Sequence, residues 1–114
     1  MFTLNENNEY EAEINGIKFV CEDFEEDYEK TAAQIAEIYE SKLDSIAQFM
    51  LDEGISDFFG ELTPDKIIES LGTPTIDLER FLVTYLEHTL DDVHIIEFEY
   101  DGILDEFFYL NIDG

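Results

Sequence analysis

The chain has 114 residues, and its 30 Asp and Glu against 5 Lys and Arg give a formal net charge of −25 at pH 7. This charge repels nucleic acids and anionic membranes and attracts cationic partners, which argues against direct binding to either polyanion. Apolar residues make up 45% of the chain and include ten Phe and six Tyr. This content argues against a disordered chain and predicts one packed domain over residues 1–114.

The cysteine content and the opening segment indicate the compartment. Cys21 is the only cysteine, which excludes an internal disulfide. The opening segment MFTLNENNEY has no basic start and no apolar run, so we expect no signal peptide. No apolar stretch approaches the length of a membrane span. These features predict a cytoplasmic protein of bacterial type.

Residues 10–21 predict a β-hairpin, because Asn15-Gly16 separates two alternating segments and is a strong signal for a two-residue type I′ turn. The turn gives three cross-strand pairs that share one apolar face: Ile14–Ile17, Ala12–Phe19 and Tyr10–Cys21. The other face is mostly charged and carries Glu9, Glu11, Glu13, Lys18, Val20 and Glu22. Glu13 opposite Lys18 is favourable, whereas Glu9 opposite Glu22 is a like-charge pair with a small cost.

Three glutamates of this outer face form a candidate binding row. Glu9, Glu11 and Glu13 are alternate residues of one strand, so their carboxylates would stand about 6.7 Å apart. A regular row of this kind suits a cationic partner. A solvated sheet face explains the same pattern.

Six carboxylates crowd the segment after the hairpin: Glu22, Asp23, Glu25, Glu26, Asp27 and Glu29. Acids at a helix start complement the positive end of the helix dipole, and Asp23 or Asp27 could cap the helix. This structural reading accounts for two or three of the six, because mutual repulsion grows with each further acid. The second interpretation is an acidic patch that faces a partner.

Residues 28–54 predict one helix with Gly54 as its stop, and its apolar face runs for about six turns. Its apolar positions recur at spacings of three and four and form one face: Tyr28, Ala32, Ile35, Tyr39, Leu43, Ile46 and Met50. A second helix is predicted in TPDKIIESLG, with Thr63 as the cap, Pro64 in the first position and Gly72 at the end.

The remaining segments predict strands in TIDLE, FLVTYLEH, VHIIEFEY and FFYLNID, the last two joined through Asp101-Gly102. FLVTYLEH could also form a short helix, but its Val, Thr, Phe and Tyr favour a strand. We expect an α+β domain. Its antiparallel sheet of five to six strands, made by the N-terminal hairpin and the C-terminal strands, would pack against one long and one short helix.

The segment ISDFFGE between the two helices predicts a loop or a short turn that carries Phe58 and Phe59. One or both rings could cap the core. An exposed ring would instead anchor an interface with an acidic rim, which is the arrangement of binding hot spots.

No dedicated metal site and no cofactor are predicted. EDFEEDYE lacks the glycine of a calcium loop, and DGILDE lacks its ligand spacing. His88 and His94 flank TLDDV and could pass as metal ligands. A loop between two strands explains Asp91 and Asp92 equally well.

The chain also lacks the patterns of an enzyme. It has no GxSxG nucleophile motif and no glycine-rich phosphate loop, and no carboxylate pair can be singled out among thirty acids. Cys21 falls on the apolar face of the hairpin, which suits a core thiol. Arg80 is the single arginine, so little is present to hold phosphate. We therefore predict a non-enzymatic protein.

The tail LGTPTIDLERF…YLEHTLDDVHIIEFEYDG…FFYLNIDG, with the INGIKF hairpin and the central helix, resembles a group of small bacterial domains of unknown function. Those chains run through an LG-P-I segment into a strand, continue through a loop and H-I-E-V…DG, and finish on a short strand with a terminal Gly. Several such domains are thought to be immunity proteins of polymorphic-toxin systems. The resemblance implies a fold and a class of function, and no site residues.

The first functional hypothesis is a cytoplasmic immunity-type inhibitor that binds and occludes a basic toxin or nuclease domain. The alternative is a DNA mimic that inhibits a DNA-binding enzyme. An even distribution gives one net charge per ~260 Å² of surface, against roughly 110 Å² for duplex DNA, so mimicry needs the charges gathered on one long face. A third option is an acidic accessory protein whose charge only prevents aggregation.

Overall fold

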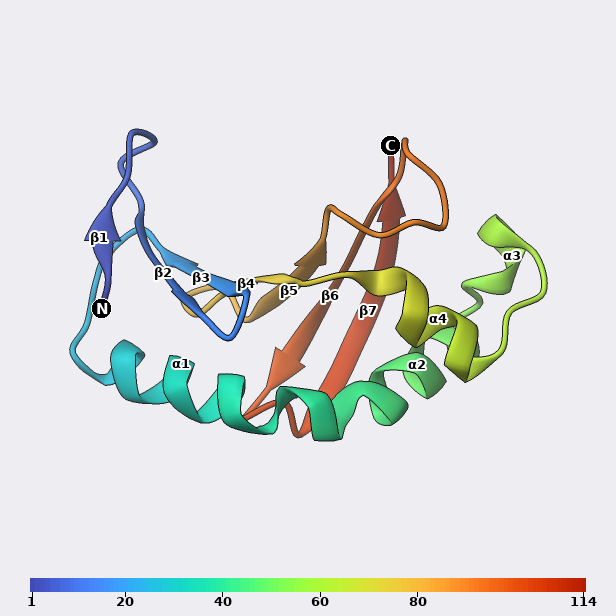
Figure 1. The fold of residues 1–114 in the computed structure, drawn as a ribbon, viewed down its shortest axis with the longest axis horizontal. Coiled ribbons are helices and arrows are strands. Elements are labelled where there is room, and N and C mark those ends of the chain that lie inside the picture. The colour runs from blue at the N-terminus through green and yellow to red at the C-terminus, as the bar shows by residue number, and fades with distance from the viewer.

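A seven-stranded sheet with helices on one of its faces makes up the structure, a computed structural model that describes residues 1–114 (Figure 1). The strands follow one another across the sheet in chain order. They are β1 (Thr3–Leu4), β2 (Tyr10–Ile14), β3 (Ile17–Cys21), β4 (Thr75–Asp77), β5 (Leu82–Tyr85), β6 (Ile95–Asp101) and β7 (Glu106–Asp113).

The predicted α+β class is confirmed, but the predicted sheet is wrong in two respects. It has seven strands because Thr3–Leu4 adds a two-residue edge strand, which is too short for its pattern to be recognised. It is mixed because β3 and β4 run parallel, while every other neighbouring pair is antiparallel. Parallel strands need a long crossover, and here that crossover holds all the helices.

The N-terminal hairpin has the predicted turn and register. Asn15 and Gly16 adopt φ values of 54° and 84°, as a type I′ turn requires. Four predicted pairs are present, Ile14–Ile17, Glu13–Lys18, Ala12–Phe19 and Tyr10–Cys21, and Glu11 pairs with Val20 in the same register. Glu9 and Glu22 lie outside the two strands, so the expected like-charge pair is not part of the ladder.

The long predicted helix is interrupted. It consists of α1 (Asp27–Ile38), a 3₁₀ turn η1 (Tyr39–Lys42) and α2 (Leu43–Asp52). The predicted apolar positions still face the core through the interruption, with all seven buried or half-buried. Gly54 is the predicted stop: its N–H donates to the Leu51 carbonyl and that of Ile55 to the Met50 carbonyl, the two bonds of a Schellman ending.

Two shorter helices follow. The one-turn helix α3 (Ser56–Phe59) contains the aromatic pair of ISDFFGE. Helix α4 (Pro64–Leu71) begins and ends as predicted: the Thr63 hydroxyl accepts a hydrogen bond from the Lys66 N–H, and Gly72 takes a φ of 70° after the last turn. None of the helices combines the length and the apolar character that crossing a bilayer requires.

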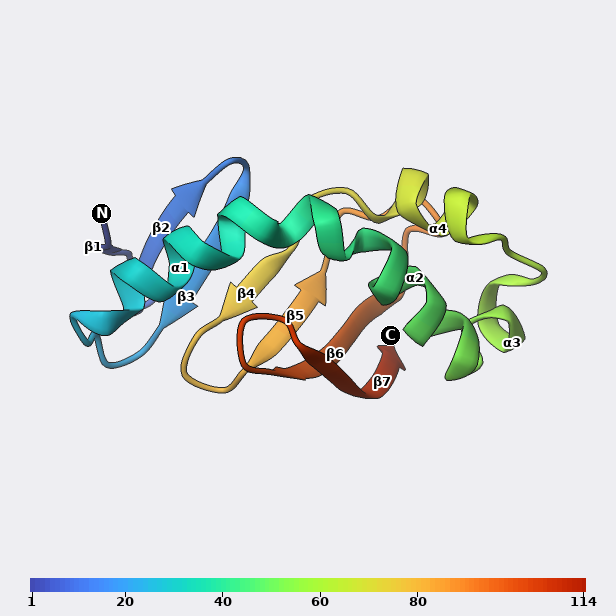
Figure 2. The same ribbon diagram turned by 90° about the horizontal axis from the view of Figure 1, so that it is seen from below.

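The core lies between the helices and one face of the sheet (Figure 2). Its centre includes the fully buried Phe19, Ile76, Tyr85 and Phe98 from four successive core strands. Tyr39 from η1 brings its hydroxyl to within 2.5 Å of the Tyr85 hydroxyl, so each buried phenol satisfies the other. Burial raises the pKa of Tyr39 to about 12, so both phenols stay neutral.

The two phenols of this pair should contribute to stability non-additively. In Tyr39→Phe the fully buried Tyr85 hydroxyl loses its partner, which we expect to cost about 1–3 kcal/mol. The double variant Tyr39→Phe/Tyr85→Phe leaves no hydroxyl unpaired, so its cost should be well below the sum of the single variants. Urea unfolding of the four proteins measures this coupling, and additive costs would contradict it.

Candidate protein-binding surface

One face of the sheet has no helix over it (Figures 1 and 2). We call this the open face. Cross-strand neighbours place two rows of side chains on it. One row is Glu11–Val20–Asp77–Leu82–Glu99–Phe108, and the other is Glu13–Lys18–Thr75–Thr84–Glu97–Asn111. The open face thus carries five carboxylates against a single cation, with apolar side chains between them.

Lys18 is the cation at the centre of a hollowed part of the open face. Its amine lies 3.7 Å from the Glu11 carboxylate, a diagonal ion pair, rather than on Glu13 directly opposite. A hollow of about 410 Å³ extends over β2, β3 and β4 from the loop that contains Glu9 to the exposed Leu86. Glu13 lines the adjoining hollow, which shares Lys18 and Leu86.

The structure therefore brings the predicted row together. Glu9, Glu11 and Glu13 all line hollows that meet at Lys18, and a single ion pair offsets their charge. An apolar wall at Leu86 and carboxylates around a concave floor suit a basic protein surface, because opposite charges steer the encounter and apolar contacts hold the complex.

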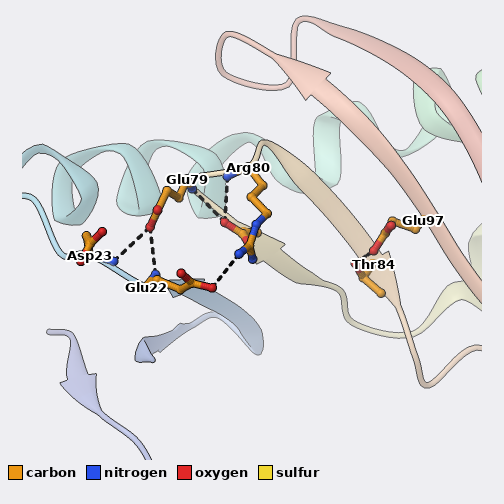
Figure 3. Close-up of polar contacts among 7 residues, drawn as sticks. Glu22, Asp23, Glu79, Arg80, Thr84 and Glu97 are labelled. Atoms are coloured by element: carbon orange, nitrogen blue, oxygen red, sulfur yellow. Dashed lines mark hydrogen bonds and ion pairs between the residues drawn. The ribbon is translucent and has the colours of Figure 1, made fainter. Parts of the chain in front are cut away.

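The acid cluster between β3 and α1 is tied to the β4–β5 turn (Figure 3). The Glu79 carboxylate accepts hydrogen bonds from the main-chain N–H groups of Glu22 and Asp23, at 2.9 and 3.0 Å. Arg80 lies 2.6 Å from the Glu22 carboxylate and 3.2 Å from that of Asp77. These bonds fix the start of the cluster beside the ends of β3 and β4.

Two further acids of the cluster have partners within the chain. Glu29 accepts a bond from the Phe2 N–H at 3.3 Å. The Glu25 carboxylate lies near the Tyr28 hydroxyl, and burial together with that carboxylate raises the Tyr28 pKa to about 12. Phe24 packs against the rings of Phe2 and Tyr10, so this connection lies against β1 and β2.

Asp23, Glu26 and Asp27 remain exposed, and their side chains make no hydrogen bond or ion pair. The expected cap by Asp23 or Asp27 is wrong. Glu26 occupies the cap position in a helical conformation, where a side chain cannot turn back to the free N–H groups, and no side-chain cap forms. Only these three acids of the cluster are free for a partner.

Helix α3, which contains Phe58 and Phe59, lies at the opposite end of the long axis from the hairpin (Figure 1). Phe58 is exposed and Phe59 is half-buried against the core. Phe59 meets both imidazoles edge-on, with ring centroids 5.9 Å from His88 and 5.8 Å from His94. The aromatic anchor and the hairpin row are therefore separate surfaces.

The two histidines are held by the β5–β6 loop. Nδ1 of His88 accepts the Leu90 N–H, so its Nε2 carries the proton and donates to the His94 carbonyl at 2.6 Å. Nδ1 of His94 bonds the Asp91 carboxylate. No group of three His, Cys, Asp or Glu side chains is placed to hold a metal ion.

Cys21 is a buried thiol at the end of β3. It is 1% exposed, and burial together with neighbouring acids raises its thiol pKa to about 11. A thiol held protonated in this way is a poor nucleophile.

Sequence reasoning missed Glu79, Arg80 and Asp77 as partners of the acid cluster. The signal was local: Asp77 begins a turn in which its carboxylate accepts the N–H groups of Glu79 and Arg80. An Asp that precedes a turn in this way is a recognisable pattern.

Comparisons with protein-family models, curated proteins and solved structures found no match to this chain.

Asp91 should make a contribution to stability that depends on pH. Main-chain and side-chain bonds from His94 lower its pKa from 3.8 to about 2, so the folded state favours the carboxylate. The contribution is then complete above about pH 4 and is lost as the pH falls towards 2. We expect Asp91→Ala to destabilise the protein at pH 6 and to differ little from the parent near pH 2, as measured by urea unfolding.

The matched control for this pH dependence is Asp92→Ala. It removes the neighbouring exposed carboxylate, which accepts no hydrogen bond in the structure, and should change stability little. An Asp91→Ala effect of equal size at both pH values would contradict the assignment.

Proposed function

We propose that this chain is a non-enzymatic, acidic protein-binding module that acts in the cytoplasm as an immunity-type inhibitor. Its partner would be a basic toxin or nuclease domain, whose nucleic-acid site it would occlude. The observation that carries the proposal is the hollowed open face, where Glu9, Glu11 and Glu13 surround one paired lysine beside exposed Leu86.

The charges on this face suit a nucleic-acid-binding enzyme. Such an enzyme holds phosphates with clustered Lys and Arg, and the carboxylates of the open face would meet the same side chains. Of the five carboxylates on the open face, Glu11 is paired with Lys18 and Asp77 with Arg80. The charges of Glu13, Glu97 and Glu99 are left for the partner. Long-range attraction would then speed association, and the apolar side chains between the acids would slow dissociation.

The distribution of acids favours a patch over DNA mimicry. Exposed carboxylates also lie on the helical side of the molecule, at Glu37, Glu40, Asp44 and Asp52. The charge is therefore not gathered on one long face, as imitation of a duplex requires. The hollow also argues against an acidic accessory protein, because a protein without a dedicated partner needs no concave binding surface.

The test of the function begins with the tagged protein in a lysate of its own source at low salt. Bound proteins are eluted with a salt gradient and identified by mass spectrometry. The proposal expects a basic toxin or nuclease in the late fractions, and one equivalent of the protein should abolish that enzyme's activity when both are purified. A partner that stays fully active, or no saturable partner under toxin-expressing conditions, would refute the inhibitor function.

The binding face is tested with charge variants against the captured partner. Neutralising the row in Glu9→Gln/Glu11→Gln/Glu13→Gln should slow association by about ten-fold at low salt and flatten its salt dependence. A matched control, Asp44→Asn/Asp52→Asn/Glu53→Gln, removes three exposed charges from the helical side and should have a smaller effect. Stopped-flow association rates compare the two, and equal slowing would place the interface elsewhere.

The acid cluster needs its own variant. Asp23→Asn/Glu26→Gln/Asp27→Asn removes only the three carboxylates without an intramolecular partner, so the fold should be retained or slightly stabilised as repulsion falls. Slower association with the partner would show that the acid cluster belongs to the binding face. An unchanged association rate would indicate that the acid cluster is only a solvated helix start.

A further inference from the structure

A cavity on the helical side of the molecule is independent of the open face. It has a volume of about 380 Å³ and is lined by residues of the β2–β3 turn, of α1 and η1 where they join, and of the end of α4. This volume is within the ~300–1,000 Å³ typical of small-molecule sites. Nothing in the proposed inhibitor function uses it.

Half of the ten residues that line this cavity are apolar. Ile17, Ala36 and Tyr39 are each at most 7% exposed, and the half-buried Leu43 and Ile68 complete the wall. The hydroxyl of Tyr39 is already bonded to Tyr85, so the tyrosine offers the cavity its ring and not a free hydroxyl. An aliphatic chain would be desolvated favourably here.

The polar part of the lining is negative. Glu37 and Glu40 both line the cavity, are exposed, and form no ion pair or hydrogen bond through their carboxylates. Gly72 also lines it, directly after α4, and α4 has no basic residue in its last turn. A helix C-terminus carries partial negative charge and favours a cation. No Lys or Arg lines the cavity.

We propose that this cavity binds an aliphatic chain that ends in a cation, with the chain on the apolar wall and the ammonium or guanidinium group at Glu37 and Glu40. Two sources share this chemistry: a Lys or Arg side chain of a protein, and a free aliphatic amine. A neutral ligand of the same shape would lack the electrostatic attraction to both carboxylates and to the C-terminal end of α4.

The test is an NMR titration of the ¹⁵N-labelled protein with n-butylguanidinium at fixed ionic strength. Saturable shifts are expected at cavity residues such as Ala36, Ile68 and Gly72, and the neutral analogue n-butylurea should bind at least about five-fold more weakly. Glu37→Gln/Glu40→Gln should weaken n-butylguanidinium binding by a similar factor. Both residues are exposed, so the variant should fold as the parent does.

The matched control is Asp44→Asn/Asp52→Asn, which removes the same charge from exposed positions of α2 outside the cavity. It should leave the affinity nearly unchanged. Equal binding of n-butylurea, equal loss in the two double variants, or shifts spread over all acidic segments would overturn the proposal. Because no protein partner is needed, this result stands apart from that of the inhibition assay.

A second arm separates the two sources. N-acetyl-arginine methylamide represents a side chain presented by a protein, and 1,4-diaminobutane represents a free amine. Saturable binding of the capped arginine at the cavity would support a protein side chain, and binding of the diamine alone would support a free amine. Failure of both probes to bind at the cavity would overturn the site.

Discussion

Burial of one apolar sheet face beneath the helices is the interaction on which the rest of this structure depends. The chain carries a net charge of −25, so its charges oppose compaction. The opposing contribution comes from a continuous core of fully buried aliphatic and aromatic side chains, with Phe19, Tyr85 and Phe98 at its centre. Because this burial takes place on one side only, the other side of the sheet is left free to carry charge.

The few cations are placed where they also position acids. Lys18 pairs with Glu11 in the middle of the open face, and Arg80 joins Glu22 to Asp77 where the acid cluster leaves the sheet. Exposed ion pairs of this kind contribute little to stability. Their effect here is to fix the geometry of a carboxylate-rich surface without neutralising it.

Features that depend on neighbouring residues could be predicted from the sequence. Features that depend on contacts between segments far apart in the chain could not. Asn15-Gly16 determined the hairpin register, and Thr63, Pro64 and Gly72 determined α4, because each signal acts over a few residues. The break at Tyr39–Lys42 was hidden because the buried spacing continues through it. The alternation of Glu9, Glu11 and Glu13 predicted that they share one surface. The separation of Phe58 from that surface depends on the path of the whole helical segment between β3 and β4.

The parallel pairing of β3 with β4 divides the sheet into two locally connected meanders. Lys18, Phe19 and Val20 pair with Thr75, Ile76 and Asp77 across an intervening segment that contains every helix. Closing so long a loop costs more entropy than closing a hairpin. Strand pairing within each meander is therefore entropically less costly than the pairing of β3 with β4 that joins the two. The hollow around Lys18 spans this junction. The hollow therefore needs both meanders in place, so a nascent chain whose β4 has not yet left the ribosome lacks it.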